Sequence, residues 1–248
     1  MKNRLSVLML SCIPLVLIGY FAFEAKDDYF SIIPMILLAL PAYYDVLRVN
    51  VVKGILVLFT LSAYATFIEA LSILTSFPYG SFQYNDQLGF KLFDLVPWTV
   101  GFGWVPLVIG AFSLSGWVCD RKLHKFLLGI FILVFSDLII DPGAVYMKFW
   151  TWIDQGIYYT VPISNYFGWL LSAIVGGGVF YLLFTDQQIN QLSFLSVFTL
   201  TLGNAFWIGV TVSSGLWIPL ILGCILQIAI YWMMQKRPEG SRTKSSIV

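Results

Sequence analysis

Two aspartates, Asp137 and Asp141, stand four residues apart near the end of an apolar stretch that runs from Phe126 to Ile140. Residues with this spacing share one face of a helix, so both carboxyl groups would point the same way. Ionisable side chains inside membrane-spanning helices are costly and usually mark functional sites. Two carboxylates this close in a low-dielectric setting cannot both ionise cheaply, so one should hold a proton near neutral pH. A protonated carboxyl group is what general acid catalysis requires.

A third acid, Glu69, lies within the apolar stretch 53–77. At 1.5 Å per residue, its carboxyl group lies roughly 12 Å below the end of that helix, and Asp137 lies about 6 Å from Asp141. All three acids are then expected in the outer half of a membrane. The structural alternative is that Asp141 only closes its helix before Pro142 and that Glu69 bonds a neighbouring span. A cost of roughly 2.5–3.5 kcal/mol for each charge at mid-helix argues for more than that.

The composition supports a membrane setting, because 59% of the 248 residues are hydrophobic and only 11% are charged. Apolar stretches close to the ~20 residues that span a bilayer recur along the chain. We therefore predict one all-α transmembrane bundle over residues 1–235 and a polar cytoplasmic tail over 236–248. Residues 1–23 resemble a signal peptide but lack a good cleavage site, so they are interpreted as a retained first span. The eight expected spans are 5–23, 29–47, 53–77, 95–117, 125–141, 163–184, 192–212 and 215–235, of which 125–141 is the shortest.

The distribution of Lys and Arg predicts the orientation, because positively charged loops stay in the cytoplasm. With both termini cytoplasmic, the inner segments hold eleven of these residues and the outer loops hold three, Lys26, Lys91 and Lys148. The even number of spans agrees with this, and the chain is expected to be a multi-pass protein of the cell membrane, with lipid as a partner. The net charge of +1 and the lack of a basic stripe argue against binding to nucleic acid.

A metal centre is not expected. Cys12, Cys119 and Cys224 show no paired spacing, and the one histidine, His124, lies in a basic inner loop. Iron oxygenases, zinc hydrolases and haem proteins need more histidine than this chain has.

Two long loops, Pro78–Asp94 and Pro142–Pro162, are both expected on the outer face, where they bring many Trp and Tyr residues near the acids. One interpretation is an interfacial belt of aromatic side chains. The other is a cup of aromatic rings that stabilises a developing carbocation, as such rings stabilise any cation. An acid beside an aromatic cup suggests protonation of an alkene.

An internal similarity connects these regions. Val96-Pro97 and Gly103-Trp104 are separated by the same five residues as Val161-Pro162 and Gly168-Trp169. Segments 53–117 and 125–184 could therefore form a pseudo-repeat, and sites often lie between such repeats. The alternative is coincidence in a chain rich in Gly and Trp.

The pattern across residues 60–172 resembles the integral-membrane carotenoid hydratases of the carotenoid biosynthesis protein family. The matching residues are Glu69, Pro78-Tyr79-Gly80, Tyr84, Leu88-Gly89, Val96-Pro97, Asp137, Asp141-Pro142, Ala144, Trp150, Trp152, Gly156, Tyr158-Tyr159, Val161-Pro162, Asn165 and Gly168-Trp169. The chain departs from the family pattern at Ser76, Gly101, Lys148 and Thr160, whereas it keeps the acids and Asp141-Pro142.

The resemblance implies hydration of the terminal double bond of an acyclic carotenoid, without a cofactor. A carboxyl group protonates the alkene, and a water activated by another carboxylate adds to the resulting tertiary cation. The catalytic candidates are Glu69, Asp137 and Asp141. The substrate-binding candidates are Tyr84, Trp98, Trp104, Trp150, Trp152, Tyr158, Tyr159, Asn165 and Trp169, among which Tyr84 and Asn165 could hold the water. A complex with other enzymes of the carotenoid pathway is left open.

Three other functions compete with hydration. A polyene cyclase would share the acid and the cup but exclude water. A prenyltransferase needs clustered aspartates for magnesium diphosphate, and Asp86 and Asp94 are too far apart for that. A non-catalytic carotenoid or lipid carrier, or a proton-coupled transporter that uses the three acids as a relay, represents a different class.

Overall fold

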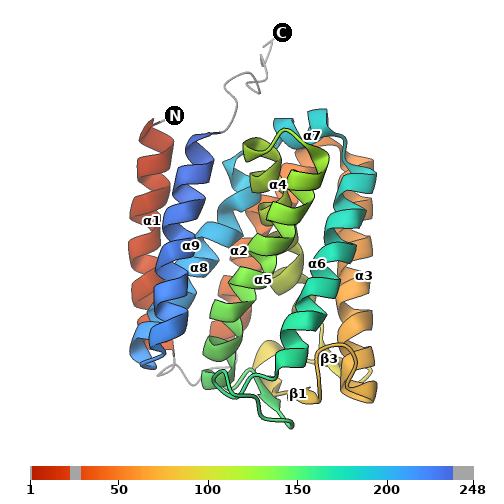
Figure 1. The fold of residues 1–248 in the computed structure, drawn as a ribbon, viewed down its shortest axis with the longest axis vertical. Helices are drawn as coiled ribbons and strands as arrows, with labels where there is room; N and C mark the ends of the chain where they lie inside the picture. The colour runs from red at the N-terminus through yellow and green to blue at the C-terminus, as the bar shows by residue number, and fades with distance from the viewer. Residues whose placement is uncertain (1, 23–28, 237–248) are drawn as a thin grey trace.

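The computed structural model describes residues 2–22 and 29–236, and it is a bundle of helices that lie roughly side by side (Figure 1). In this part of the chain, seven helices are long and apolar enough to cross a membrane, which confirms the predicted all-α polytopic bundle. The first expected span corresponds to α1, whose apolar part, Met9–Phe21, is shorter than the seven candidate spans. Residue 23 and residues 237–248 of the expected tail lie outside the described ranges. The helices are α1 Lys2–Phe21, α2 Tyr29–Val49, α3 Val51–Thr75, α4 Val100–Val118, α5 Lys122–Tyr146, α6 Ile163–Leu183, α7 Asp186–Gln191, α8 Phe198–Ser213 and α9 Trp217–Gln235.

The helix α4 lies at the centre of the bundle, where it packs on α2, α3, α5, α6, α8 and α9. It is almost entirely buried from Trp104 to Trp117. The start of α1, the end of α9 and the short helix α7 lie at one end of the bundle, and the strands lie at the opposite end (Figure 1). The first helix therefore begins, and the last helix ends, at the same end of the bundle (Figure 1), which is compatible with the predicted placement of both termini on one side of the membrane.

The helix α5 differs from its prediction. It was expected to be the shortest span, ending at Asp141, but it continues through Pro142 to Tyr146. A proline inside a helix has no N–H for the carbonyl four residues earlier, which here is that of Leu138. The hydroxyl of Tyr158 donates to this Leu138 carbonyl at 3.0 Å and takes the place of the missing N–H. Asp141 therefore lies inside the helix, and it does not close it.

The two long loops are joined by a pair of strands. Strand β1 (Phe82–Tyr84) follows α3, strand β4 (Trp150–Trp152) follows α5, and the two pair antiparallel. In the first loop, the 3₁₀ turn η2 (Asp86–Leu88) precedes a hairpin of β2 (Lys91–Leu92) and β3 (Val96–Pro97). Because Val96-Pro97 belong to a strand, α4 begins five residues later than expected.

An unexpected buried acid, Asp45, connects helices at the end of the bundle opposite the strands. Its side chain on α2 is fully buried, and its two oxygens accept hydrogen bonds from Arg48 at 2.7 Å and from the backbone N–H of Ser193 at 2.6 Å. Ser193 lies between α7 and the 3₁₀ turn η3 (Phe194–Val197) that leads into α8. Both carboxylate oxygens are satisfied, so Asp45 connects α2 to the start of α8 and is not free for chemistry.

We expect Asp45→Ala to lower the free energy of unfolding by roughly 3 kcal/mol, because loss of one partner leaves a partly buried Arg48 charge uncompensated. Thermal unfolding in detergent measures this effect. Asp86→Ala is the matched control, because Asp86 pairs with Lys91 but its side chain is 93% exposed, and exposed ion pairs contribute little. Equal loss of stability in both variants would contradict the assigned role of Asp45.

Candidate functional site

The two aspartates of α5 meet a single amide group of α6. The Nδ2 of Asn165 donates to Oδ2 of Asp137 at 2.7 Å and to Oδ2 of Asp141 at 2.6 Å. All three side chains are buried, with exposed fractions of 1–2%. An amide nitrogen carries two hydrogens, so Asn165 uses both of them on this pair. The two carboxyl groups do point the same way, as their spacing predicted.

The paired strands connect these aspartates to Glu69. The register of β1 and β4 places Tyr84 opposite Trp150, and the two rings lie edge to face with centroids 5.8 Å apart. The indole Nε1 of Trp150 donates to Oδ1 of Asp141 at 2.8 Å. The Tyr84 hydroxyl donates to Oε2 of Glu69. The three acids are therefore linked through one set of side chains from both loops, which runs Glu69, Tyr84, Trp150, Asp141, Asn165, Asp137.

Tyr84 remains a neutral donor in this arrangement. Burial raises the pKa of Tyr84 well above its ordinary value, and whenever Glu69 is ionised its charge raises that pKa further. The phenol therefore keeps its proton and presents it to Oε2 of Glu69. The second carboxyl oxygen of Glu69 can then carry the proton of the neutral acid.

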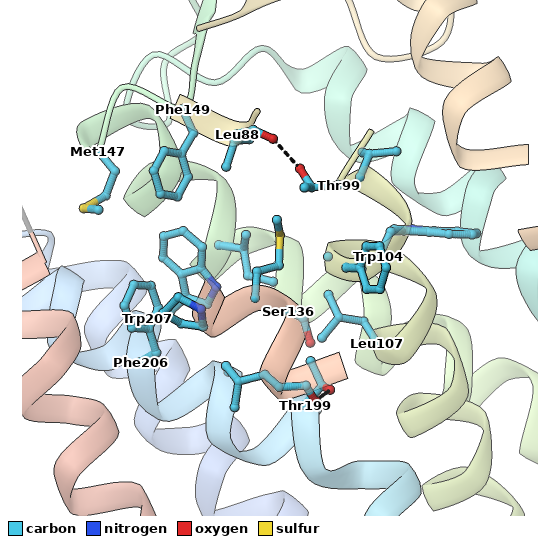
Figure 2. A pocket seen from close by; sticks show the side chains of 18 of the residues that line it. Leu88, Thr99, Trp104, Leu107, Ser136, Met147, Phe149, Thr199, Phe206 and Trp207 are labelled. Atoms are coloured by element: carbon cyan, nitrogen blue, oxygen red, sulfur yellow. Dashed lines mark hydrogen bonds between the residues drawn. The ribbon is translucent and has the colours of Figure 1, made fainter. Parts of the chain in front are cut away.

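A cavity of about 240 Å³ lies beside Glu69 and Tyr84. Figure 2 shows its wall, with Met147 and Phe149 near the outer loops, Trp207 and Phe206 on one side, Trp104 and Leu107 on the other, and Thr199 at the inner end. Among the described residues that line it, Glu69 is the one acid. The lining hydroxyls of Thr99, Ser136 and Thr199 donate to backbone carbonyls, so their protons are already used. The cavity is thus an apolar space with one carboxyl group in its wall.

The predicted site residues fall into two groups. Glu69 and four of the substrate-binding candidates border the cavity, namely Tyr84, Trp104, Trp150 and Trp169. Asp137, Asp141 and Asn165 do not line it, and they lie behind Trp150. The Trp104 and Trp169 of the two similar motifs both face this cavity, which is compatible with a pseudo-repeat but does not test it.

Four further candidates have other surroundings. Trp98 stacks on Phe90 in the first loop, and Trp152 packs on Phe82 across the strand pair. Tyr158 bonds the Leu138 carbonyl, and the Tyr159 hydroxyl accepts from the backbone N–H of Ile218 at the start of α9. None of the four lines the cavity described here. Trp98 and Trp152 thus pack within the loop region, whereas Tyr158 and Tyr159 bond their loop to α5 and α9.

Three buried polar atoms of α5, β4 and α6 have no hydrogen-bond partner among the described residues. They are Oδ1 of Asp137, the hydroxyl of Tyr166 and Nε1 of Trp152. Such atoms in native proteins usually bind ordered water. Asp137 therefore has one oxygen held by Asn165 and one that can accept a hydrogen bond from water.

Sequence reasoning missed the part of the cavity wall that comes from α2 and α8. Met35, Phe206 and Trp207 line the cavity but carry no charge and belong to no motif. The adjacent aromatic residues Phe206 and Trp207 in the seventh expected span were the one available signal. Gly143 allows this packing, because a Cβ there would lie 2.7 Å from the Trp207 ring.

The described residues contain no group of three or more His, Cys, Asp or Glu side chains that could hold a metal ion. The three acids are separated by Tyr84, Trp150 and Asn165, whose side chains occupy the positions between them.

Comparison with known proteins adds independent information. A family model described as carotenoid biosynthesis protein matches residues 27–230. Among curated proteins, a bisanhydrobacterioruberin hydratase from Haloarcula japonica is 28% identical over 215 residues, which cover 84% of this chain and 73% of that protein. No solved structure gives a significant match.

Proposed function

This chain belongs to the carotenoid biosynthesis protein family, and we propose that it is an enzyme that adds water to the terminal acyclic double bond of a carotenoid. The similarity to a protein named as a hydratase supports this reaction. The observation that carries the proposal is Glu69, a carboxyl group bonded to Tyr84 in the wall of an otherwise apolar, aromatic cavity. Such a cavity suits the hydrocarbon end of a substrate dissolved in the membrane.

The proposed reaction starts with the neutral form of Glu69. Its carboxyl proton is transferred to the less substituted carbon of the double bond, and the π electrons form the new C–H bond. The more substituted carbon becomes a tertiary cation, and Glu69 becomes a carboxylate. The oxygen of a water molecule then bonds to the cation and releases a proton to the Glu69 carboxylate. The product is a tertiary alcohol, and the acid is restored.

The aromatic side chains around the cavity supply the stabilisation of the cation. Trp104, Trp150 and Trp169 all line it. The face of an indole ring attracts a cation by about 0.5–2 kcal/mol, most strongly where water is excluded. The reaction transfers a proton and adds water without a change in oxidation state, so it needs no redox cofactor.

The aspartate pair takes a different role from Glu69 in this proposal. Asp141 holds the Trp150 indole at the cavity wall, and Asn165 keeps Asp141 in place. Asp141 is therefore a positioning residue. The Oδ1 of Asp137, which has no partner among the described residues, can bind a water molecule outside the cavity. Glu69 alone acts on the reacting atoms.

The proposal is tested by expressing the chain in a bacterial host that accumulates lycopene or an elongated acyclic carotenoid. Extracted pigments are separated by liquid chromatography with mass detection. We expect a product heavier by one water per modified end, with an unchanged polyene spectrum. An isomer of unchanged mass and altered spectrum would instead identify a cyclase. Pigment that copurifies with the protein but is never converted would identify a carrier.

A further inference from the structure

We infer that the polyene tail of the substrate lies in a lateral opening between α1 and α2, so that only its end group occupies the cavity beside Glu69. This inference rests on the proposed function, because it names the way in which a carotenoid reaches that site. It concerns residues of α1 and α2 that no sequence motif singled out.

The size of the cavity requires an opening. Sites that enclose a drug-sized ligand measure about 300–1,000 Å³, and this cavity has about 240 Å³. An extended carotenoid is as long as the hydrocarbon core of a membrane is thick, about 30 Å. The cavity can therefore hold an end group, and the remaining polyene must leave the protein into lipid.

The side chains that line the cavity show where it reaches the surface. Leu15 and Ile18 of α1 and Met35 and Leu38 of α2 line it, and most of the described side chains of these two helices are not buried. Ile18 is 40% exposed, and the other three are partly exposed. These side chains thus face the cavity and the membrane at once. They lie toward the outer ends of their helices, the half of the bundle that contains Glu69.

Helix packing explains why this side stays open. α1 packs along α8 at very short range, because a Cβ on Gly19 would lie 2.0 Å from the Phe206 carbonyl oxygen and one on Gly209 would lie 2.0 Å from that of Val16. Glycines at such crossings let two helices approach closely. α2 packs on α3, α4 and α8. Over their described residues, α1 and α2 have no extended contact with each other.

The chemistry of the opening fits a hydrocarbon. Every residue that α1 and α2 contribute to the cavity is apolar, Pro34 included. A polyene loses no hydrogen bonds when it moves from lipid into such a passage, whereas a polar molecule would. The cavity would therefore discriminate between substrates by their end group, whereas the opening would accept polyene tails of different structure. The arrangement also implies that the two ends of one carotenoid are modified in separate binding events.

Ile18→Trp tests the opening by narrowing it. Turnover is measured with a full-length acyclic carotenoid and with a short alkene that has the same end group and fits inside the cavity. We expect the ratio of long-substrate to short-substrate turnover to fall by about ten-fold, since a bulky residue obstructs only the tail. The matched control is Ile225→Trp on α9, which is also lipid-facing, with 53% exposure, but does not line the cavity. That control should leave the ratio unchanged.

An unchanged ratio in Ile18→Trp would place the tail elsewhere and overturn the inference. A second readout does not depend on activity. Benzoylphenylalanine is placed at position 18 or 225, the protein is irradiated with bound carotenoid, and the pigment adduct is found by mass spectrometry. We expect an adduct at 18 and none at 225. If the wild-type protein converts neither substrate but cross-links at 18, the proposed function fails while the opening stands. Cross-linking at 225 alone would refute the opening.

Discussion

Glu69→Gln should reduce turnover of the carotenoid by about 10²- to 10⁴-fold, the usual contribution of a positioned general acid. The amide has nearly the same shape as the acid, and its oxygen can still accept the hydrogen bond from Tyr84. What it lacks is a proton that it can transfer to an alkene. The cavity should therefore keep its form, and the substrate should still bind.

The measurement compares the product formed with the amount of carotenoid that copurifies with each variant. Asp94→Asn serves as the control, because Asp94 is an exposed acid of the outer loop that does not line the cavity. It should keep both turnover and pigment. Normal turnover in Glu69→Gln would exclude Glu69 as the proton donor, and loss of pigment binding together with turnover would point to a structural role.

Much of the bundle could be predicted because the membrane imposes simple rules. Apolar stretches of suitable length located the helices. The orientation that the asymmetry of Lys and Arg indicates stays a prediction. Glu69 stood out because a charge in an apolar helix needs a reason. The same rule should have drawn attention to Asp45, which lies inside the second expected span. Its partner Ser193 is 148 residues away in the sequence, and no local sequence pattern predicts a contact over such a separation.

The errors arose where distant segments meet. Pro142 was interpreted as a helix end, but a hydroxyl from the next loop satisfies the carbonyl that it leaves free. The pairing of β1 with β4 was equally invisible, because each strand has only three residues and the two lie in different loops. That pairing places Tyr84 beside Trp150 in the cavity wall. The sequence left open whether the aromatic residues form an interfacial belt or a cup, and only the tertiary structure shows which of them line the cavity.

The role of Asp141 leads to the second large effect. Asp141→Asn should lower kcat by about 10- to 100-fold, because a mispaired buried hydrogen bond costs about 1–3 kcal/mol. In the wild-type protein, both oxygens of Asp141 accept from donors, one from Trp150 and one from Asn165. An amide must turn its NH₂ group toward one of these donors. Either Trp150 moves from the cavity wall or Asn165 loses its partner.

Asp137→Asn separates this positioning role from acid–base chemistry. Asp137 accepts only from Asn165, and its other oxygen has no partner among the described residues. An amide there can keep the bond to Asn165 and direct its NH₂ group to the unpartnered side, so we expect a much smaller loss of kcat than in Asp141→Asn. Steady-state kinetics of both variants in the same detergent decide the matter. Equal losses would mean that the carboxylate charge itself is needed, and proton transfer would then involve the aspartate pair as well as Glu69.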